Sequence, residues 1–342
     1  MRYYVNRLTQ AVVVLLLAIT VTFVLYRLMP LNPIEMIRAQ MLEEMAQGGQ
    51  TLTPEDLERV DRRIESYTGF DPDQSVYAAY FEYMTNILIY QDFGQSIRLR
   101  QPVFDLMLDR LPWSVFISVY GLALGVTTSL LFGAIMAYYE GGRFDKAMTV
   151  ITISMNSVPY YVVAIMTLIV FAFGLGWFPI TGRSASGTTA GVNLPYIKGI
   201  IHHATLPVLS GFVAGFGGAL AYRGNCVREM GKGYLRVARL RGISESRLAI
   251  RYVGRNALLP IYTGLMMGIA GIFGSSVILE IIFNYQAMGL LTFDALLNRD
   301  YPLLMGSFIF YTAITLVGLL IADLTYGIID PRVKGGAERE TY

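Results

Sequence analysis

Six apolar stretches are the feature that most constrains how this chain folds. Each is long enough to cross a bilayer as a helix, which takes about 20 mostly apolar residues. They cover roughly residues 8–29, 113–139, 147–175, 204–222, 256–283 and 303–328. Only 15% of the 342 residues are charged, whereas a soluble domain carries charge on about a quarter of its residues. The sequence therefore predicts an all-α integral membrane protein with six transmembrane helices.

The first apolar stretch is longer than the core of a removable signal. Such a core has roughly 7–15 residues and ends at a small-residue cleavage site. Here Arg2 and Arg7 precede the stretch, and it runs into Arg27-Leu28-Met29-Pro30 without a small-residue pattern. We expect it to be retained as the first span.

The six stretches divide the chain into segments of different character. We expect residues 1–29 to hold the N-terminus and first span, 30–112 a large extracytoplasmic segment, 113–330 a five-helix transmembrane core, and 331–342 a tail. The loop 223–255, between the fourth and fifth spans, is rich in arginine, whereas the short loops opposite hold only Arg183, Lys198 and Arg299. Because short cytoplasmic loops carry the excess of Lys and Arg, both termini and this loop are expected in the cytoplasm.

The long segment after the first span has two helix signals. Thr53-Pro54 followed by Glu55 and Asp56 is typical of a helix start, with a cap residue, proline at the first position and acids in the first turn. Tyr and Phe recur between Val76 and Tyr90, which indicates a second helix at the outer membrane interface. The segment is either a packed cap on the spans or a docking surface for a partner.

Ionisable residues inside the spans are few, and one cluster of polar residues stands out. Asn156, Ser157 and Pro159 cluster within the third span. A proline in mid-span frees a backbone carbonyl, which is tolerated where protein or a water-filled cavity satisfies it. These three residues are our candidates for lining a water-filled pathway through the membrane, with a packed kink as the alternative. Glu280 and Asp323 lie near span ends, so we expect them to be structural.

The sequence has none of the common catalytic or nucleotide-binding motifs. It contains no H-E-x-x-H, no G-x-S-x-G and no G-x-x-x-x-G-K-[ST], so it is not expected to be an enzyme or to bind ATP through a P-loop. The single cysteine, Cys226, excludes an internal disulfide and a cysteine-based zinc site. His202 and His203 are adjacent and would point about 100° apart on a helix, so no metal site is expected. A net charge of +2 gives no general attraction to nucleic acid.

The basic loop reads as two short helices separated by a glycine. The first covers Tyr234 to Arg241, Gly242 supplies a left-handed stop, Ser244 can cap the next helix, and that helix runs from Glu245 to about Gly254. Neither is long enough to span a membrane. The small Ala238 and Gly242 would let a partner surface approach closely.

This loop resembles the cytoplasmic coupling loop of ATP-binding-cassette importer permeases. The family pattern E-A-A-x-x-x-G followed by L-P stands here as Arg236-Val237-Ala238, Gly242 and Leu259-Pro260. In this chain the Glu and the first Ala of the pattern are replaced, and the gap before L-P is longer. Both departures resemble the dipeptide and oligopeptide branch of the family, which also includes nickel permeases. The ending Arg255-Asn256-Ala257-Leu258-Leu259-Pro260 is similar to that branch as well.

The resemblance extends along most of the chain. Asp92-Phe93-Gly94-Gln95-Ser96 is similar to the D-x-G-x-S of this branch, and Glu280-Ile281-Ile282-Phe283 and Arg299-Asp300-Tyr301-Pro302 are close matches near the end. One departure is Gln286-Ala287-Met288-Gly289, where the family often has P-G-L-G.

The resemblance implies a transport subunit that forms half of a pathway for di- or oligopeptides in a bacterial or archaeal plasma membrane. It implies as partners a second homologous permease, two ATP-binding subunits that carry ATP and Mg, and an extracytoplasmic solute-binding protein. No cofactor is expected in this chain. The residues implied to couple it to the ATPases are Tyr234, Leu235, Arg236, Val237, Ala238, Arg239, Arg241, Gly242 and Ser244.

Three alternatives stay open. The same machinery carries oligosaccharides or nickel chelates in relatives of this branch. A self-sufficient secondary carrier would need internal repeats or charges near the midplane. An intramembrane enzyme would need paired catalytic groups within the spans, and the sequence does not pair any.

Overall fold

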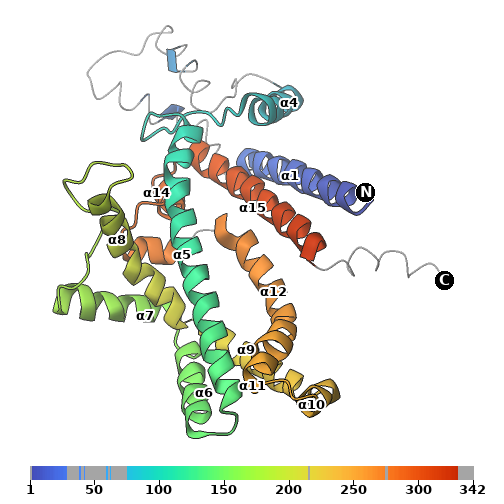
Figure 1. Cartoon of the computed structure of the whole chain (residues 1–342). Coiled ribbons are helices and arrows are strands. Elements are labelled where there is room, and N and C mark those ends of the chain that lie inside the picture. Colours follow the sequence, from blue (N-terminus) through green and yellow to red (C-terminus); the bar gives the residue numbers. More distant parts are fainter. Residues whose placement is uncertain are drawn as a thin grey trace. The chain divides into compact units, whose positions relative to one another are not determined.

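The computed structural model describes residues 2–28, 38, 39, 42, 59, 60, 62, 75–214, 216–273 and 276–329 (Figure 1). Within these residues the chain is helical, apart from loops and one isolated β-bridge between Gln95 and Pro102. The chain divides into two compact units. One comprises Met1–Pro112 with Ala287–Leu320, and the other comprises Trp113–Gln286 with Ile321–Tyr342.

Two helices, α5 and α15, have residues in both units. The helices with residues in the first unit are α1 (Arg2–Leu28), α4 (Val76–Thr85), the π-helix η1 (Asn86–Tyr90), α5 (Val103–Tyr138), α14 (Met288–Leu297) and α15 (Tyr301–Ile329). The others, all in the second unit, are α6 (Arg143–Asn156), α7 (Tyr160–Thr167), the π-helix η2 (Leu168–Gly174), α8 (Leu194–Ala214), α9 (Gly218–Met230), α10 (Gly233–Leu240), α11 (Glu245–Arg247), the π-helix η3 (Leu248–Gly254), α12 (Arg255–Ala270), the 3-10 helix η4 (Gly271–Phe273) and α13 (Val277–Ile282).

The all-α class is confirmed, whereas the count of six spans is met only in part. Among the described residues three helices are long and apolar enough to cross a membrane: Val5–Leu25, Val103–Tyr138 and Tyr301–Asp323. Two bent pairs would raise the number to five if each pair is one span. The expected span 256–283 is instead divided into α12, η4 and α13. Gly271 follows the last residue of α12, and glycine is a poor helix former.

The fourth expected span, 204–222, is also not one straight helix. α8 begins at Leu194 and ends at Ala214, and α9 starts after a bend of 51°. Gly217 and Gly218 lie at this bend, and they lower the cost of leaving the helical conformation. α9 then continues through Arg223 and Arg228 to Met230. The helix therefore extends beyond residue 222, where the predicted apolar span ends.

The expected outer helix at 76–90 is present as α4 and η1. The Ser75 side chain caps α4 by accepting a hydrogen bond from the Ala78 N–H at 3.4 Å. Tyr80 and Tyr83 pack against Phe23 of α1 with ring centroids 5.4 and 5.7 Å away. The helix expected to start at Thr53 lies almost wholly outside the described residues.

A buried carboxylate organises the loop that precedes α5. Asp300 accepts hydrogen bonds from the Ser96 hydroxyl at 2.5 Å and from the backbone N–H groups of Ile97 and Arg98 at 3.3 and 3.2 Å. Ser96 in turn accepts from the N–H of Leu99 at 2.9 Å. Both Ser96 and Asp300 are fully or almost fully buried. The segments 92–96 and 299–302, which both match the family pattern, are therefore joined by hydrogen bonds to Asp300.

We predict that Asp300→Ala lowers the free energy of unfolding by about 3 kcal/mol, because buried donors lose a charged acceptor. The melting temperature of the detergent-purified protein checks this. Asp294→Ala is the matched control, since Asp294 is exposed on the preceding helix α14. Equal melting temperatures for the two variants would contradict the role of Asp300.

Candidate functional site

The helix α10 ends at a turn that two backbone hydrogen bonds close around Gly242. The N–H of Gly242 donates to the carbonyl of Arg239 at 2.9 Å, and the N–H of Ile243 donates to the carbonyl of Ala238 at 3.3 Å. These two bonds form a Schellman motif, which requires a left-handed residue after the helix. Gly242 supplies it with φ of +74°. The predicted left-handed stop is therefore confirmed.

The inner face of α10 is anchored in an apolar cluster of the chain itself. Leu235 and Ala238 are buried there against Cys226, Leu248 and Val253. Ala238 is only 6% exposed, so the expectation that its small side chain leaves room for a partner is wrong. Its methyl instead lets α10 pack closely on α9 and η3.

The outer face of α10 combines apolar and basic side chains. Val237 is 51% exposed and Leu240 is 82% exposed, and the neighbouring Arg236 and Arg239 are exposed as well. Leu240 was not among the predicted site residues. The signal that could have found it is its place three residues after Val237, which puts both on one face of a helix.

A polar network ties the start of α10 to two other helices. The Tyr234 hydroxyl donates to the Glu229 carboxylate of α9 and accepts from the Asn256 side-chain amide of α12 at 2.9 Å. Lys232 pairs with the same carboxylate at 2.6 Å. Burial and the Glu229 carboxylate raise the pKa of Tyr234 above its ordinary value, so its hydroxyl stays a donor at neutral pH.

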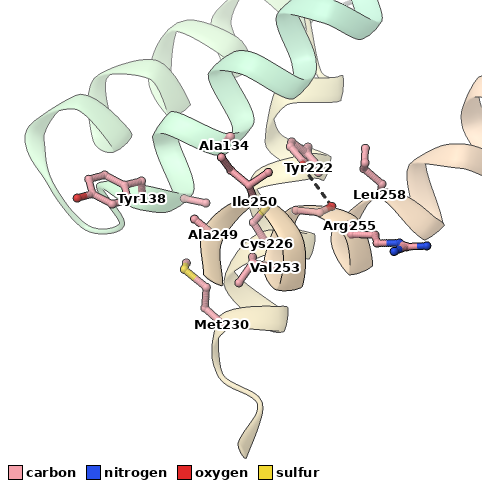
Figure 2. Close-up of a pocket in the computed structure, with 12 residues that line it drawn as sticks. Ala134, Tyr138, Tyr222, Cys226, Met230, Ala249, Ile250, Val253, Arg255 and Leu258 are labelled. Atoms are coloured by element: carbon pink, nitrogen blue, oxygen red, sulfur yellow. Dashed lines mark hydrogen bonds between the residues drawn. The ribbon is translucent and has the colours of Figure 1, made fainter. Parts of the chain in front are cut away.

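The second predicted helix is present as α11 and η3, which lead directly into α12. Ser244 lies at the N-cap of α11 with extended backbone, but its side chain makes no capping hydrogen bond. Arg239 and Glu245 pair at 3.0 Å across the Gly242 turn, while Arg241 is exposed beside it. Figure 2 shows the Tyr222 hydroxyl of α9 donating to the Gly254 carbonyl at the end of η3, 3.4 Å away.

An ion pair holds α9 near its middle. Arg223 donates from Nε and Nη2 to the two carboxylate oxygens of Asp145 in α6, at 2.5 and 2.6 Å. The Gly141 N–H donates to the same carboxylate at 2.9 Å. The Asp145 side chain is 3% exposed and that of Arg223 is 26% exposed. A bidentate contact of this kind fixes both the distance and the orientation between the two side chains.

The pathway candidates lie at a helix break. α6 ends at Asn156, Ser157 is its C-cap and Pro159 is the N-cap of α7, with a bend of 95° between the two helices. The expected kink is thus a sharp break, and all three residues are exposed. The Asn156 side chain also lies against Gly217, where an added Cβ would be 3.2 Å from its amide nitrogen. The breaks after α6 and after α8 therefore meet.

Comparison with known proteins places these features in a family. Residues 129–335 match the family described as binding-protein-dependent transport system inner membrane component. Residues 1–118 match the N-terminal part described for the membrane component of such transport systems.

Similar full-length proteins are transport permeases. The oligopeptide transport system permease protein AppB of Bacillus subtilis (strain 168) is 30% identical over 337 residues, covering 98% of this chain and 100% of the relative. The oligopeptide transport system permease protein OppB of Haemophilus influenzae is 30% identical over 335 residues, covering 98% and 99%. The dipeptide transport system permease protein DppB of Lactococcus lactis subsp. cremoris is 28% identical over 334 residues, covering 97% and 99%.

We predict that Arg223→Gln lowers the free energy of unfolding by about 3 kcal/mol, because it leaves the Asp145 carboxylate buried without its cation. Thermal unfolding in detergent measures the loss, and Arg223→Lys should restore part of it. Arg143→Gln is the control, since Arg143 is exposed at the start of the same α6. A loss no larger than that of the control would refute the role of this pair.

Proposed function

This chain belongs to the family of binding-protein-dependent transport system inner membrane components, as a multi-pass permease of the peptide-importing ATP-binding-cassette type, and on that basis we propose that it forms half of a translocation pathway for di- or oligopeptides. A second homologous permease completes the pathway in this proposal. Two ATP-binding subunits dock in the cytoplasm and carry the ATP and Mg, and an extracytoplasmic solute-binding protein delivers the peptide.

The observation that carries the coupling part of the proposal is the two-faced helix α10. Its inner face is held by the apolar cluster around Leu235 and Ala238, and its outer face presents Val237, Leu240 and arginines. Apolar and basic groups together on an exposed helix suit docking in a groove of a partner protein. We assign that partner as the ATP-binding subunit.

Force passes from this helix to the spans in the proposed mechanism. When the ATP-binding subunits close, α10 moves with the groove that holds it, because packed helices move as rigid bodies. The Tyr234–Glu229–Asn256 network and the closed turn at Gly242 transmit the motion to α9 and α12. The spans then switch between inward and outward opening. The basic residues of 223–255 support a cytoplasmic location for this site and for both termini.

The pathway part of the proposal rests on the paired helix breaks. Asn156 and Ser157 offer an amide and a hydroxyl at the bend between α6 and α7, and the Asn156 side chain contacts the bend at Gly217. Irregular backbone at membrane depth is tolerated where it is buried in protein or lines a water-filled cavity. We propose that these residues line the route of the peptide.

We predict that Gly242→Val uncouples ATP hydrolysis from uptake or prevents assembly, because a β-branched residue at positive φ costs about 1–2 kcal/mol and distorts the turn. Peptide uptake and ATP hydrolysis are measured together in proteoliposomes that contain the complete set of partner chains. Gly233→Val is the matched control, since Gly233 lies in the same helix with negative φ and open space around it.

We predict that Val237→Asp uncouples transport without unfolding the chain, because Val237 is exposed on the docking face of α10. Ala238→Asp, by contrast, buries a carboxylate in the apolar cluster and should destabilise the chain itself. Val192→Asp in an exposed outer loop is the control for Val237→Asp. Wild-type coupling in both Val237→Asp and Gly242→Val would exclude this docking face.

The substrate is tested through the complex rather than through this chain alone. We expect short peptides to stabilise the cognate solute-binding protein against heat and to stimulate ATP hydrolysis by the assembled transporter. Stimulation by oligosaccharides or nickel chelates, but not by peptides, would reassign the substrate and leave the coupling role intact.

A further inference from the structure

An apolar cavity of about 380 Å³ lies beside the coupling segment, between the end of α5 and the helices α9, η3 and α12. This volume falls within the roughly 300–1000 Å³ of ordinary small-molecule sites. Figure 2 shows the side chains of Met230, Ile250 and Val253 around Cys226, with Arg255 at one edge. Arg255 is the only charged residue among those that line the cavity.

Arg255 lines this cavity, and two further arginines precede it along the chain at regular spacing. Arg247, Arg251 and Arg255 recur every four residues, a spacing that keeps side chains on neighbouring positions of a helix surface. All three are exposed, and in the described part of the chain no carboxylate pairs with them. An apolar hollow with a basic rim complements a molecule that has an apolar body and an anionic end.

The cavity opens next to the end of a helix that is long and apolar enough to span the membrane. On α5, Leu131 is 55% exposed and Tyr138 is 72% exposed, and Tyr138 lines the cavity. Aromatic side chains at the end of a span favour the level of the lipid head groups. Ile250, which also lines the cavity, is exposed on η3 as well. In a chain that spans the bilayer, lipid is an apolar molecule that can reach this opening.

We propose that this cavity binds an acyl chain of an anionic phospholipid of the cytoplasmic leaflet, with the head-group phosphate at Arg255. Basic pockets between transmembrane helices on the cytoplasmic side suit anionic head groups. The site rests on the membrane placement of the chain and on its cytoplasmic loop. It does not depend on which substrate is transported.

The bound chain would contact the anchor of the coupling helix. Tyr222, Cys226 and Val253 line the cavity, and they also belong to the apolar cluster that buries Leu235 and Ala238. Filling the cavity replaces empty space beside the cluster with van der Waals contact. The lipid would thereby stiffen the apolar cluster on which α10 packs. We therefore expect more peptide transported per ATP hydrolysed in membranes that contain anionic phospholipid.

The test uses the assembled transporter in nanodiscs with photoreactive lipids that carry a diazirine in one acyl chain. We expect photoreactive phosphatidylglycerol to label peptides from residues 222–258 about fivefold more than photoreactive phosphatidylcholine, as one basic residue at a lipid head group implies. Alkylation of Cys226 by N-ethylmaleimide should be slower in phosphatidylglycerol nanodiscs than in phosphatidylcholine nanodiscs. Because Cys226 is the single cysteine of the chain, its alkylation is read directly from the digested protein.

Two variants separate the head-group contact from the acyl-chain contact. Arg255→Gln should reduce labelling by phosphatidylglycerol to the level of phosphatidylcholine, whereas Arg228→Gln, an exposed arginine outside the cavity, should not. Ala134→Leu should occupy part of the cavity and reduce the excess labelling by phosphatidylglycerol. Ala123→Leu, exposed on the same α5 but outside the cavity, should leave labelling unchanged.

The wild-type measurement alone decides the proposal if a variant does not fold. Equal labelling by the two lipids would show unselective solvating lipid and overturn it. Crosslinking of the cavity residues to a partner chain instead of lipid would also overturn it, because that chain would then occupy the cavity. Both readings are taken without peptide or ATP, so loss of peptide transport leaves them unaffected.

Discussion

Hydrocarbon offers no hydrogen-bond partner to a backbone N–H or C=O, and this constraint shapes every part of the chain that enters the membrane. It explains why the apolar stretches form helices and why an interruption within them needs hydrogen-bond partners of its own. At the bend after α6, the N–H of Ser157 donates back to the carbonyl of Ile153, and the Asn156 side chain donates to the carbonyl of Thr152. The bend is thus a hydrogen-bonded structure rather than a stretch of unpaired backbone.

Internal contacts also hold the segment around α10 together. Backbone bonds close the turn at Gly242, the Arg239–Glu245 pair crosses it, and the Tyr234 hydroxyl joins α9 and α12. Apolar burial of Leu235 and Ala238 supplies the remaining attachment. A segment tied at so many points moves as one body, which is the property that transmission of force requires.

The sequence predicts features that depend on local chemistry. The stop at Gly242 follows from the freedom of glycine at positive φ, and the outer helix 76–90 follows from its aromatic pattern. Features that depend on packing between distant segments were missed. Hydropathy does not show that Ala238 points inward or that Leu240 is exposed, because both depend on packing. It also does not show the bend at Gly217 or the division of the stretch 256–283 into separate helices. The pairing of Ser96 with Asp300 joins residues about two hundred positions apart, and one sequence contains no signal for it.

The helix α9 links the two functional parts of the second unit without interruption. It begins at Gly218, beside the bend that touches Asn156, and ends at Met230, three residues before α10. Thirteen residues at 1.5 Å per residue make a rod of roughly 20 Å, and a tilt of about 6° about its middle moves each end by about 1 Å. A pivot at the Arg223–Asp145 pair, near the middle of α9, would turn a small swing at the Met230 end into an opposite swing at the junction of the two bends.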